Sequence, residues 1–134
     1  MPQAVKGKGS GEGRSIRDFR ELVAWQKAHA LVMNIYKMTK DFPEEERFGL
    51  TIQLRRAAVS IAANIAEGFK RPGKKGKIQS YSVSQASLEE VKYYLILAND
   101  LDYSKEAGRL LEHCEPVAQL LNGLINSAQT LAAE

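Results

Sequence analysis

Residues 110–131, LLEHCEPVAQLLNGLINSAQTL, carry the clearest periodic pattern in the chain. Apolar residues recur there in alternating steps of four and three, which places them on one face of an α-helix. Sustained over about three heptads, this pattern is typical of a helix that packs along a bundle. Pro116 lies inside the pattern, and because proline removes a backbone hydrogen bond we expect a kink or a late helix start. The residues of this face are Leu110, Cys114, Val117, Leu121, Leu124, Ala128 and Leu131.

Three earlier segments show the same helical period. Asp18 and Glu21 have the spacing of a capping box at the start of the first helix. Pro43 stops that helix and opens a short turn, whereas Gly68 is expected to end the second helix as a left-handed cap. The predicted helices cover about residues 18–40, 50–67 and 78–100, followed by the fourth helix, which Asp102 or Ser104 can cap.

Each of the first three helices has an apolar face that is wide enough to be buried. On the first helix this face comprises Leu22, Trp25, His29, Val32 and Tyr36, flanked by Ala28, Leu31 and Ile35. On the second it comprises Leu50, Leu54, Ala57, Ile61 and Ile65, beside a strip of Ala58, Ala62 and Ala66. On the third it comprises Tyr81, Ser84, Leu88, Val91, Leu95 and Ala98.

Length and composition limit the possible architectures. The chain has 134 residues, of which 44% are hydrophobic and 26% charged, as in an ordinary globular protein of one domain. No segment alternates with period two, so strands are not expected. We predict an all-α fold, an antiparallel up-down four-helix bundle over residues 18–134, preceded by a flexible basic tail over residues 1–17.

The sequence also predicts where the protein resides. Its apolar runs are far shorter than the roughly 18 residues that a membrane span needs. The N-terminus lacks the apolar core of a secretory signal, and the single Cys114 cannot form an intramolecular disulfide. We therefore expect a cytoplasmic protein without a membrane partner.

Charge is distributed unevenly along the chain. Residues 1–88 contain 16 Lys and Arg against 8 Asp and Glu, whereas residues 89–134 contain 3 against 8. The first part of the chain is therefore basic and the last part acidic. This distribution favours either a polyanion such as RNA or DNA, or a second copy of the chain, as the partner. A merely solvated charge run is the remaining alternative. The candidate nucleic-acid contacts lie in a predicted loop and in the tail: Lys70, Arg71, Lys74, Lys75 and Lys77, with Lys6, Lys8 and Arg14.

A row of polar residues runs beside the apolar face of the second helix, and the third helix carries a similar row. If the two rows meet, Arg55 or Arg56 could pair with Glu90, since buried charges persist only when they are paired. A solvated face, a subunit interface and a network inside the bundle remain open. The residues of the candidate network are Arg55, Arg56, Ser60, Asn64, Glu67, Ser87 and Glu90.

No catalytic or metal-binding arrangement is recognisable. His29 and His113 are isolated from other residues at metal-ligand spacing, and no nucleophile has a neighbouring base. We expect His29, Trp25, Tyr36 and Tyr81 to pack in the core, Cys114 to be buried and His113 to be exposed. The sequence therefore predicts no enzyme, no metal, no cofactor and no small-molecule substrate.

Several motifs together resemble a known family. They are Trp25-Gln26-Lys27-Ala28, Phe48-Gly49-Leu50-Thr51, Gln53-Leu54-Arg55-Arg56-Ala57-Ala58-Val59-Ser60-Ile61, Asn64-Ile65-Ala66-Glu67-Gly68, Ser87-Leu88-Glu89-Glu90 and Leu95-Ile96-Leu97-Ala98. The combination is similar to the four-helix bundle proteins encoded in intervening sequences of bacterial 23S ribosomal RNA genes. The resemblance covers about residues 19–131.

The resemblance implies a homopentameric ring without known enzymatic activity. Relatives of this family include the accessory variability determinant of diversity-generating retroelements, which binds nucleic acid and a reverse transcriptase. The resemblance thus implies a nucleic-acid-binding scaffold that could support a reverse transcriptase. A protein-only interaction module, encoded in a 23S rRNA intervening sequence, is the alternative.

Overall fold

The computed structural model describes residues 15–132, and all regular structure in this range is helical. The all-α class and the four helices are therefore confirmed for these residues. Lys6, Lys8 and Arg14, in the predicted tail, lie outside the described residues. The helices are α1 (Val23–Thr39), α2 (Leu50–Lys70), α3 (Lys74–Asp100) and α4 (Ala107–Gln129), with short 3-10 helices η1 (Phe19–Glu21) and η2 (Glu44–Glu46).

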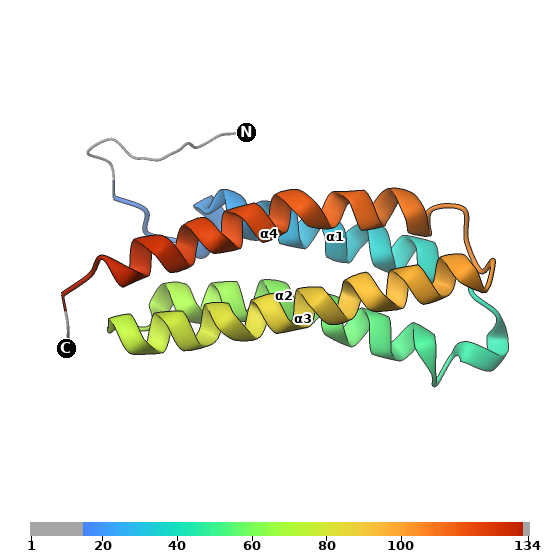
Figure 1. Cartoon of the computed structure of the whole chain (residues 1–134). Coiled ribbons are helices and arrows are strands. Elements are labelled where there is room, and N and C mark those ends of the chain that lie inside the picture. The colour runs from blue at the N-terminus through green and yellow to red at the C-terminus, as the bar shows by residue number, and fades with distance from the viewer. Residues whose placement is uncertain (1–14, 133–134) are drawn as a thin grey trace.

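The four helices lie side by side along one axis (Figure 1). Each helix packs against its neighbour in sequence, α1 also packs against α4, and the most extensive contact joins α2 to α3. The α1–α2 and α3–α4 connections lie at one end, and the α2–α3 connection lies at the other (Figure 1). Within the described range, no helix is long and apolar enough to cross a membrane.

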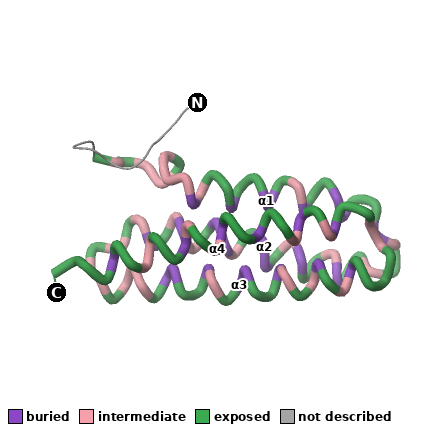
Figure 2. The backbone as a smooth tube through the Cα atoms, turned by 45° about the horizontal axis from the view of Figure 1, so that its top comes forward, coloured by how far each residue is buried: buried purple, intermediate pink, exposed green. Residues whose placement is uncertain are grey.

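The core is built from the faces that the periodicity predicts on α2, α3 and α4. Every residue predicted for the faces of α2 and α3 is buried, and the buried positions point toward the axis of the molecule (Figure 2). On α4 the face is buried from Leu110 to Leu121 and at Ala128. Leu124 is half-buried, whereas Leu131 is exposed because it lies beyond the end of the helix.

The predicted face of α1 is wrong at its aromatic edge. His29 and Tyr36 are exposed and Trp25 is half-buried, although Val32 is buried as expected. The rings remain at the boundary because apolar side chains without rings fill the centre of the buried face, and rings that carry polar groups are suited to a boundary. That centre consists of Ala24, Ala28, Leu31, Ile35 and Met38.

The start of the first predicted helix differs from the capping-box prediction. The Asp18 carboxylate accepts a hydrogen bond from the backbone of Arg20 and caps η1, not α1. Leu22 is extended, so α1 begins only at Val23. Beyond Pro43 the predicted short turn is confirmed as η2.

The second helix continues past Gly68 to Lys70, so the predicted left-handed cap is wrong. Gly68 is buried within the last turn, where a Cβ atom would lie 2.5 Å from Cε1 of the Tyr81 ring on α3. The glycine is therefore explained by the close approach of two helices and not by backbone conformation.

Before α4, the Ser104 hydroxyl accepts a hydrogen bond from the backbone N–H of Glu106, but the N-cap position is Glu106 itself, so neither Asp102 nor Ser104 is the N-cap residue. The helix begins at Ala107 and continues through the exposed Pro116, so the expected late start does not occur.

We predict that Gly68→Ala destabilises the protein, although alanine normally stabilises a helix by about 1 kcal/mol relative to glycine. The added methyl group would overlap the buried Tyr81 ring, and such overpacking costs roughly 1–3 kcal/mol. We therefore expect the free energy of unfolding to fall by up to about 2 kcal/mol in urea denaturation, the cost of overpacking less the gain in helix propensity. Gly123→Ala on α4 is the matched control, because a Cβ atom at that position would have nothing within 4 Å. A Gly68→Ala protein stabilised as much as the Gly123→Ala protein would contradict the packing argument.

Candidate nucleic-acid interface

Five cations gather where α2 turns into α3, and we call this set (Lys70, Arg71, Lys74, Lys75 and Lys77) the basic end. The sequence predicted one long loop here, but only residues 71–73 connect the helices. The other predicted loop residues form the last residue of α2 and the first turn of α3. A Cβ atom at Gly76 would lie 3.0 Å from Cδ of Arg71, so the absence of a side chain at Gly76 leaves room for the Arg71 side chain against this turn.

Lys77 has an internal role at this end. Its ammonium group donates hydrogen bonds to the carbonyl oxygens of Phe69 at 2.8 Å and Gly68 at 3.2 Å. These carbonyls belong to the last turn of α2, whose carbonyl groups lack partners within the helix. Burial lowers the pKa of Lys77. Lys77 therefore caps α2 and is a poor candidate for phosphate contact.

Arg71 is also partly neutralised. Its guanidinium donates to the Glu67 carboxylate at 2.9 Å, one turn earlier on α2. Glu67 is thus an ion-pair partner of the basic end and not a member of the polar network with α3. Lys70 and Lys75 are exposed and Lys74 is half-buried, so these three lysines present most of the positive charge at the surface of this end.

The beginning of the described chain lies beside the basic end. The pKa of Asp18 is lowered to about 2, chiefly by the hydrogen bond from the Arg20 guanidinium and to a smaller extent by the charge of Lys70. Contacts between η1 and α2 place the same segment against α2. The predicted tail cations precede this segment in the sequence.

The predicted polar network exists in part. The Ser87 hydroxyl on α3 donates to the Ser60 hydroxyl on α2 at 2.8 Å, and the Asn64 amide donates to the Ser60 carbonyl at 2.9 Å. A further bond that the sequence did not indicate joins the Ser84 hydroxyl to the Ile61 carbonyl at 2.8 Å. Three of the seven predicted residues thus take part in neutral hydrogen bonds at the junction of α2 and α3.

The predicted pairing of Arg55 or Arg56 with Glu90 is wrong. The Arg55 side chain points to α1, where its Nε donates to the Thr39 hydroxyl at 2.8 Å and its Nη2 to the Tyr36 carbonyl at 3.3 Å. The guanidinium also lies over the Tyr36 ring, 4.5 Å from its centroid. Arg56 and Glu90 are exposed and form no ion pair within residues 15–132.

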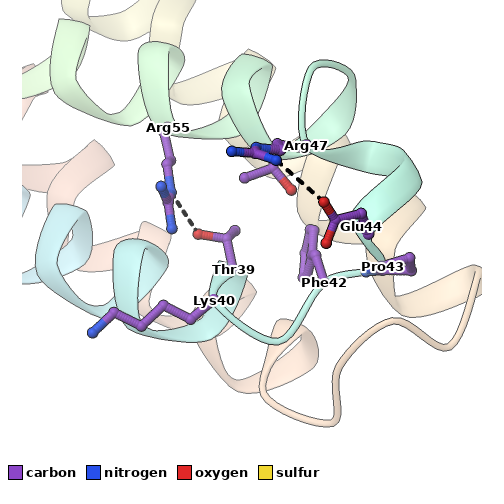
Figure 3. A pocket seen from close by; sticks show the side chains of 8 residues that line it. Thr39, Lys40, Phe42, Pro43, Glu44, Arg47 and Arg55 are labelled. Atoms are coloured by element: carbon purple, nitrogen blue, oxygen red, sulfur yellow. Dashed lines mark hydrogen bonds and ion pairs between the residues drawn. The ribbon is translucent and has the colours of Figure 1, made fainter.

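Arg55 also lines a pocket at the opposite end of the molecule from the basic end (Figures 1 and 3). The pocket has a volume of about 220 Å³ and lies where the α1–α2 connection meets both helices. Sequence reasoning missed this site because its residues, although all lie within residues 39–55, follow no motif. The lining residues are Thr39, Lys40, Phe42, Pro43, Glu44, Arg47, Thr51 and Arg55, and we call the site the Arg55 pocket.

Glu46 fixes the connection beside this pocket. One carboxylate oxygen accepts a hydrogen bond from the Leu50 N–H at 2.9 Å and the other from the Tyr103 hydroxyl at 2.8 Å. The backbone hydrogen bond from Leu50 is the main cause that lowers the pKa of Glu46, and the Tyr103 hydroxyl adds to it. Because Gly49 has no side chain to cap α2, Glu46 supplies the cap and ties it to the α3–α4 connection.

The remaining chemically distinctive residues are placed as follows. His29 is exposed and stacks on Trp25 with ring centroids 4.8 Å apart, and His113 is exposed as predicted. Cys114 is buried as predicted, and burial raises the pKa of its thiol to about 11. Within the described range, no three His, Cys, Asp or Glu side chains lie together as a metal site.

Comparisons with known proteins agree with this architecture. The family model described as "23S rRNA-intervening sequence protein" matches residues 20–123. A solved structure of a protein of unknown function from the S23 ribosomal protein family of Bacteroides thetaiotaomicron VPI-5482 superposes with a TM-score of 0.70. The two share 22% identity over 78% of this chain and 96% of that chain, a level that supports the fold alone. No curated protein matches the sequence.

We predict that Glu46 makes the stability depend on pH. Its pKa is lower in the folded than in the unfolded state, so the ionised carboxylate stabilises the fold above the unfolded pKa of about 4.3. This stabilisation is lost as the pH falls through the lower, folded pKa. In urea unfolding from neutral to acidic pH, Glu46→Gln should therefore lose less stability than the parent. Glu45→Gln, a change at the exposed neighbour, should leave the dependence of the unfolding free energy on pH as in the parent. If Glu46→Gln also shows the parental dependence on pH, the Glu46 carboxylate does not have this stabilising role.

Proposed function

The chain belongs to the family of 23S rRNA-intervening sequence proteins, and from this premise we propose that it is a non-enzymatic scaffold that binds RNA or DNA. The observation that carries the proposal is the gathering of Lys70, Lys74 and Lys75 at the α2–α3 connection. In this proposal the helices form an antiparallel up-down bundle, and several copies close into a ring, a pentamer by family resemblance. A reverse transcriptase is a further candidate partner on the same resemblance, and Cys114 suits the reducing cytoplasm.

The three lysines would act by neutralising phosphates and releasing counterions. Long aliphatic stems allow their ammonium groups to reach a backbone without a fixed geometry, so they supply affinity but no base readout. A single copy offers few contacts. In a ring, the same end of every copy would face one strand, and contacts made by tethered copies add to each other at high effective concentration. Selectivity would then come from the shape of the RNA or from a protein partner.

The tail adds to this surface. The described chain begins close to α2, which η1 contacts. Lys6, Lys8 and Arg14 precede it and are included in the proposed contact set. Arg71 and Lys77 are assigned a smaller share because they pair with Glu67 and with the end of α2.

We expect the triple change Lys70→Glu, Lys74→Glu and Lys75→Glu to abolish most nucleic-acid binding. In a salt series with single-stranded RNA, the parent should lose affinity steeply as salt rises. The plot of log affinity against log salt should become shallower by about 2 per bound copy in a variant with the three lysines changed to Gln, since each single-strand phosphate contact contributes roughly 0.7.

The matched control places the same three charge changes elsewhere, at the exposed Lys27, Lys37 and Lys105. It alters the net charge equally but leaves the basic end intact, so it should retain most of the affinity. Affinity that does not change with salt, or an equal loss in both triple variants, would exclude the basic end as the interface.

A protein-only interaction module is the second candidate, and exposed apolar side chains on α1 and α2 favour it. Met33 and Tyr36 on α1, and Ile52 and Val59 on α2, are exposed. Arg55 lies three residues from Ile52 and four from Val59, and it reaches Tyr36, so one surface across α1 and α2 carries these side chains. An exposed apolar surface of this kind suits self-association.

If this surface joins copies of the chain, Ile52→Glu with Val59→Glu should convert a closed oligomer into monomers, as measured by native mass spectrometry. The control is Val83→Glu, which introduces a charge at an equally exposed valine on α3 and should leave the oligomer intact. A parent protein that is monomeric would refute self-association through this surface, as would an oligomer that survives the double change. The protein-only role is favoured over the scaffold role if the oligomer forms and no RNA or DNA binds.

A further inference from the structure

The Arg55 pocket has the composition of an anion site. Lys40, Arg47 and Arg55 contribute three positive charges against the single negative charge of Glu44. The Thr39 and Thr51 hydroxyls add polar groups. Phe42 and Pro43 complete the lining with apolar surface, which weakens the competition from water for charged contacts at the wall.

Arg55 is held in place before any ligand arrives. The Thr39 hydroxyl donates to the Ile35 carbonyl at 2.7 Å, and its oxygen accepts from Arg55 at 2.8 Å. Thr39 is almost fully buried, so this arrangement is anchored in the core. The Tyr36 carbonyl and ring hold the other side of the guanidinium.

The anchoring leaves donors available. A guanidinium has five N–H groups in a planar fork. Two hydrogen bonds, to Thr39 and Tyr36, are the ones that Arg55 forms with the described residues. The remaining N–H groups can therefore bind an oxyanion without rotation of the side chain, and binding then loses little conformational entropy.

Arg47 is positioned to join Arg55. Figure 3 shows both arginines on the α2 side of the pocket, with Glu44 across from Arg47 and the Lys40 side chain extended away from both. The Arg47–Glu44 pair spans 3.2 Å and both side chains are largely exposed, so the pair contributes little to stability. Arg47 can therefore exchange this partner for a more highly charged one. Thr51 lies in the first turn of α2, where the helix dipole also favours an anion.

We propose that the Arg55 pocket binds a phosphate group, with Arg55 as the fixed donor and Arg47 and Thr51 as donors that close on it. Two arginines suit the double negative charge and the several acceptor oxygens of a phosphate better than the single charge of a carboxylate. The Phe42 ring is buried against Tyr103, so it offers no open face on which a base could stack. The phosphate could come from a small phosphorylated molecule or from the 5′ end of a nucleic acid.

The test is a titration of the full-length protein with sodium phosphate, followed by amide chemical shifts and compared with sodium chloride at equal ionic strength. Phosphate at millimolar concentration should shift the signals of Arg47, Thr51 and Arg55 and raise the melting temperature, whereas chloride should not. Arg47→Gln and Thr51→Val should each weaken binding, and Arg47→Gln should do so about tenfold, as expected for a lost charge-assisted hydrogen bond.

Arg55→Lys keeps the charge but loses the fork, so it should also weaken phosphate binding. Arg56→Gln is the matched control, since Arg56 adjoins Arg55 in sequence, is exposed and does not line the pocket. If Arg55→Lys unfolds the protein, Arg47→Gln and Thr51→Val still test phosphate binding, because both residues lie on the surface of the pocket. Shifts that are absent, that chloride reproduces, or that Arg56→Gln weakens equally would overturn the proposal.

The two possible sources of the phosphate, a small molecule and the end of a nucleic acid, are distinguished with a pair of short RNAs. One RNA carries a 5′-phosphate and the other a 5′-hydroxyl. Tighter binding of the phosphorylated RNA, lost in Arg47→Gln but kept in the Lys70, Lys74 and Lys75 triple variant, would assign the pocket to RNA ends. Equal binding of both RNAs, together with the pocket shifts caused by free phosphate, would assign it to a small phosphorylated molecule. Phosphate binding in the Arg55 pocket does not depend on the basic end. An experiment that contradicts this proposal can therefore be distinguished from one that contradicts the scaffold proposal.

Discussion

The close packing of α2 against α3 is the constraint on which the rest of the structure depends. Alanines line the buried face of α2, and where Gly68 meets Tyr81 there is no room even for a methyl group. At this distance two of the hydroxyls that α3 buries find partners on α2, and these bonds matter because an unpaired buried polar group is costly. Ser84 bonds the Ile61 carbonyl and Ser87 bonds Ser60, so the two helices can adopt only one register. That register allows a connection of only three residues, which brings the cations on both sides of it together.

The cations at this connection divide into structural charges and charges at the surface. Lys77 satisfies carbonyl groups at the end of α2, and Arg71 is held by Glu67 one turn earlier. These contacts stabilise the turn whose shape presents the lysines on either side. The count of basic residues in the sequence therefore overstates the charge available to a ligand, although the location of that charge is as the sequence predicts. Charge reversal at the lysines alone leaves the supports of the turn in place.

The faces of α2 and α3 could be predicted because each repeats an unambiguous apolar period, and burial follows that period directly. The face of α1 was harder to predict, since Trp25, His29 and Tyr36 have both apolar bodies and polar groups and are suited to a boundary as well as to a core. Helix ends depended on contacts that local sequence does not contain. Gly68 looks like a cap in the sequence, but the ring that explains it belongs to Tyr81 on the next helix. Arg55 was predicted to pair with Glu90 on α3, but its partner lies on α1, 16 residues earlier, and no local pattern distinguishes Thr39 from Glu90 as that partner.

The two ends of the molecule can act independently of each other. The 21 residues of α2 separate them, which corresponds to about 30 Å of helix. Screening in physiological salt reduces interactions between exposed charges beyond about 8 Å. Three negative charges introduced at the basic end therefore change the potential at the Arg55 pocket very little. The pocket is also held by different contacts, since Thr39 and Tyr36 fix Arg55 while Glu46 and Tyr103 fix the connection beside it. Electrostatic coupling between the two ends is therefore weak, and each end can be tested in a protein whose opposite end is intact.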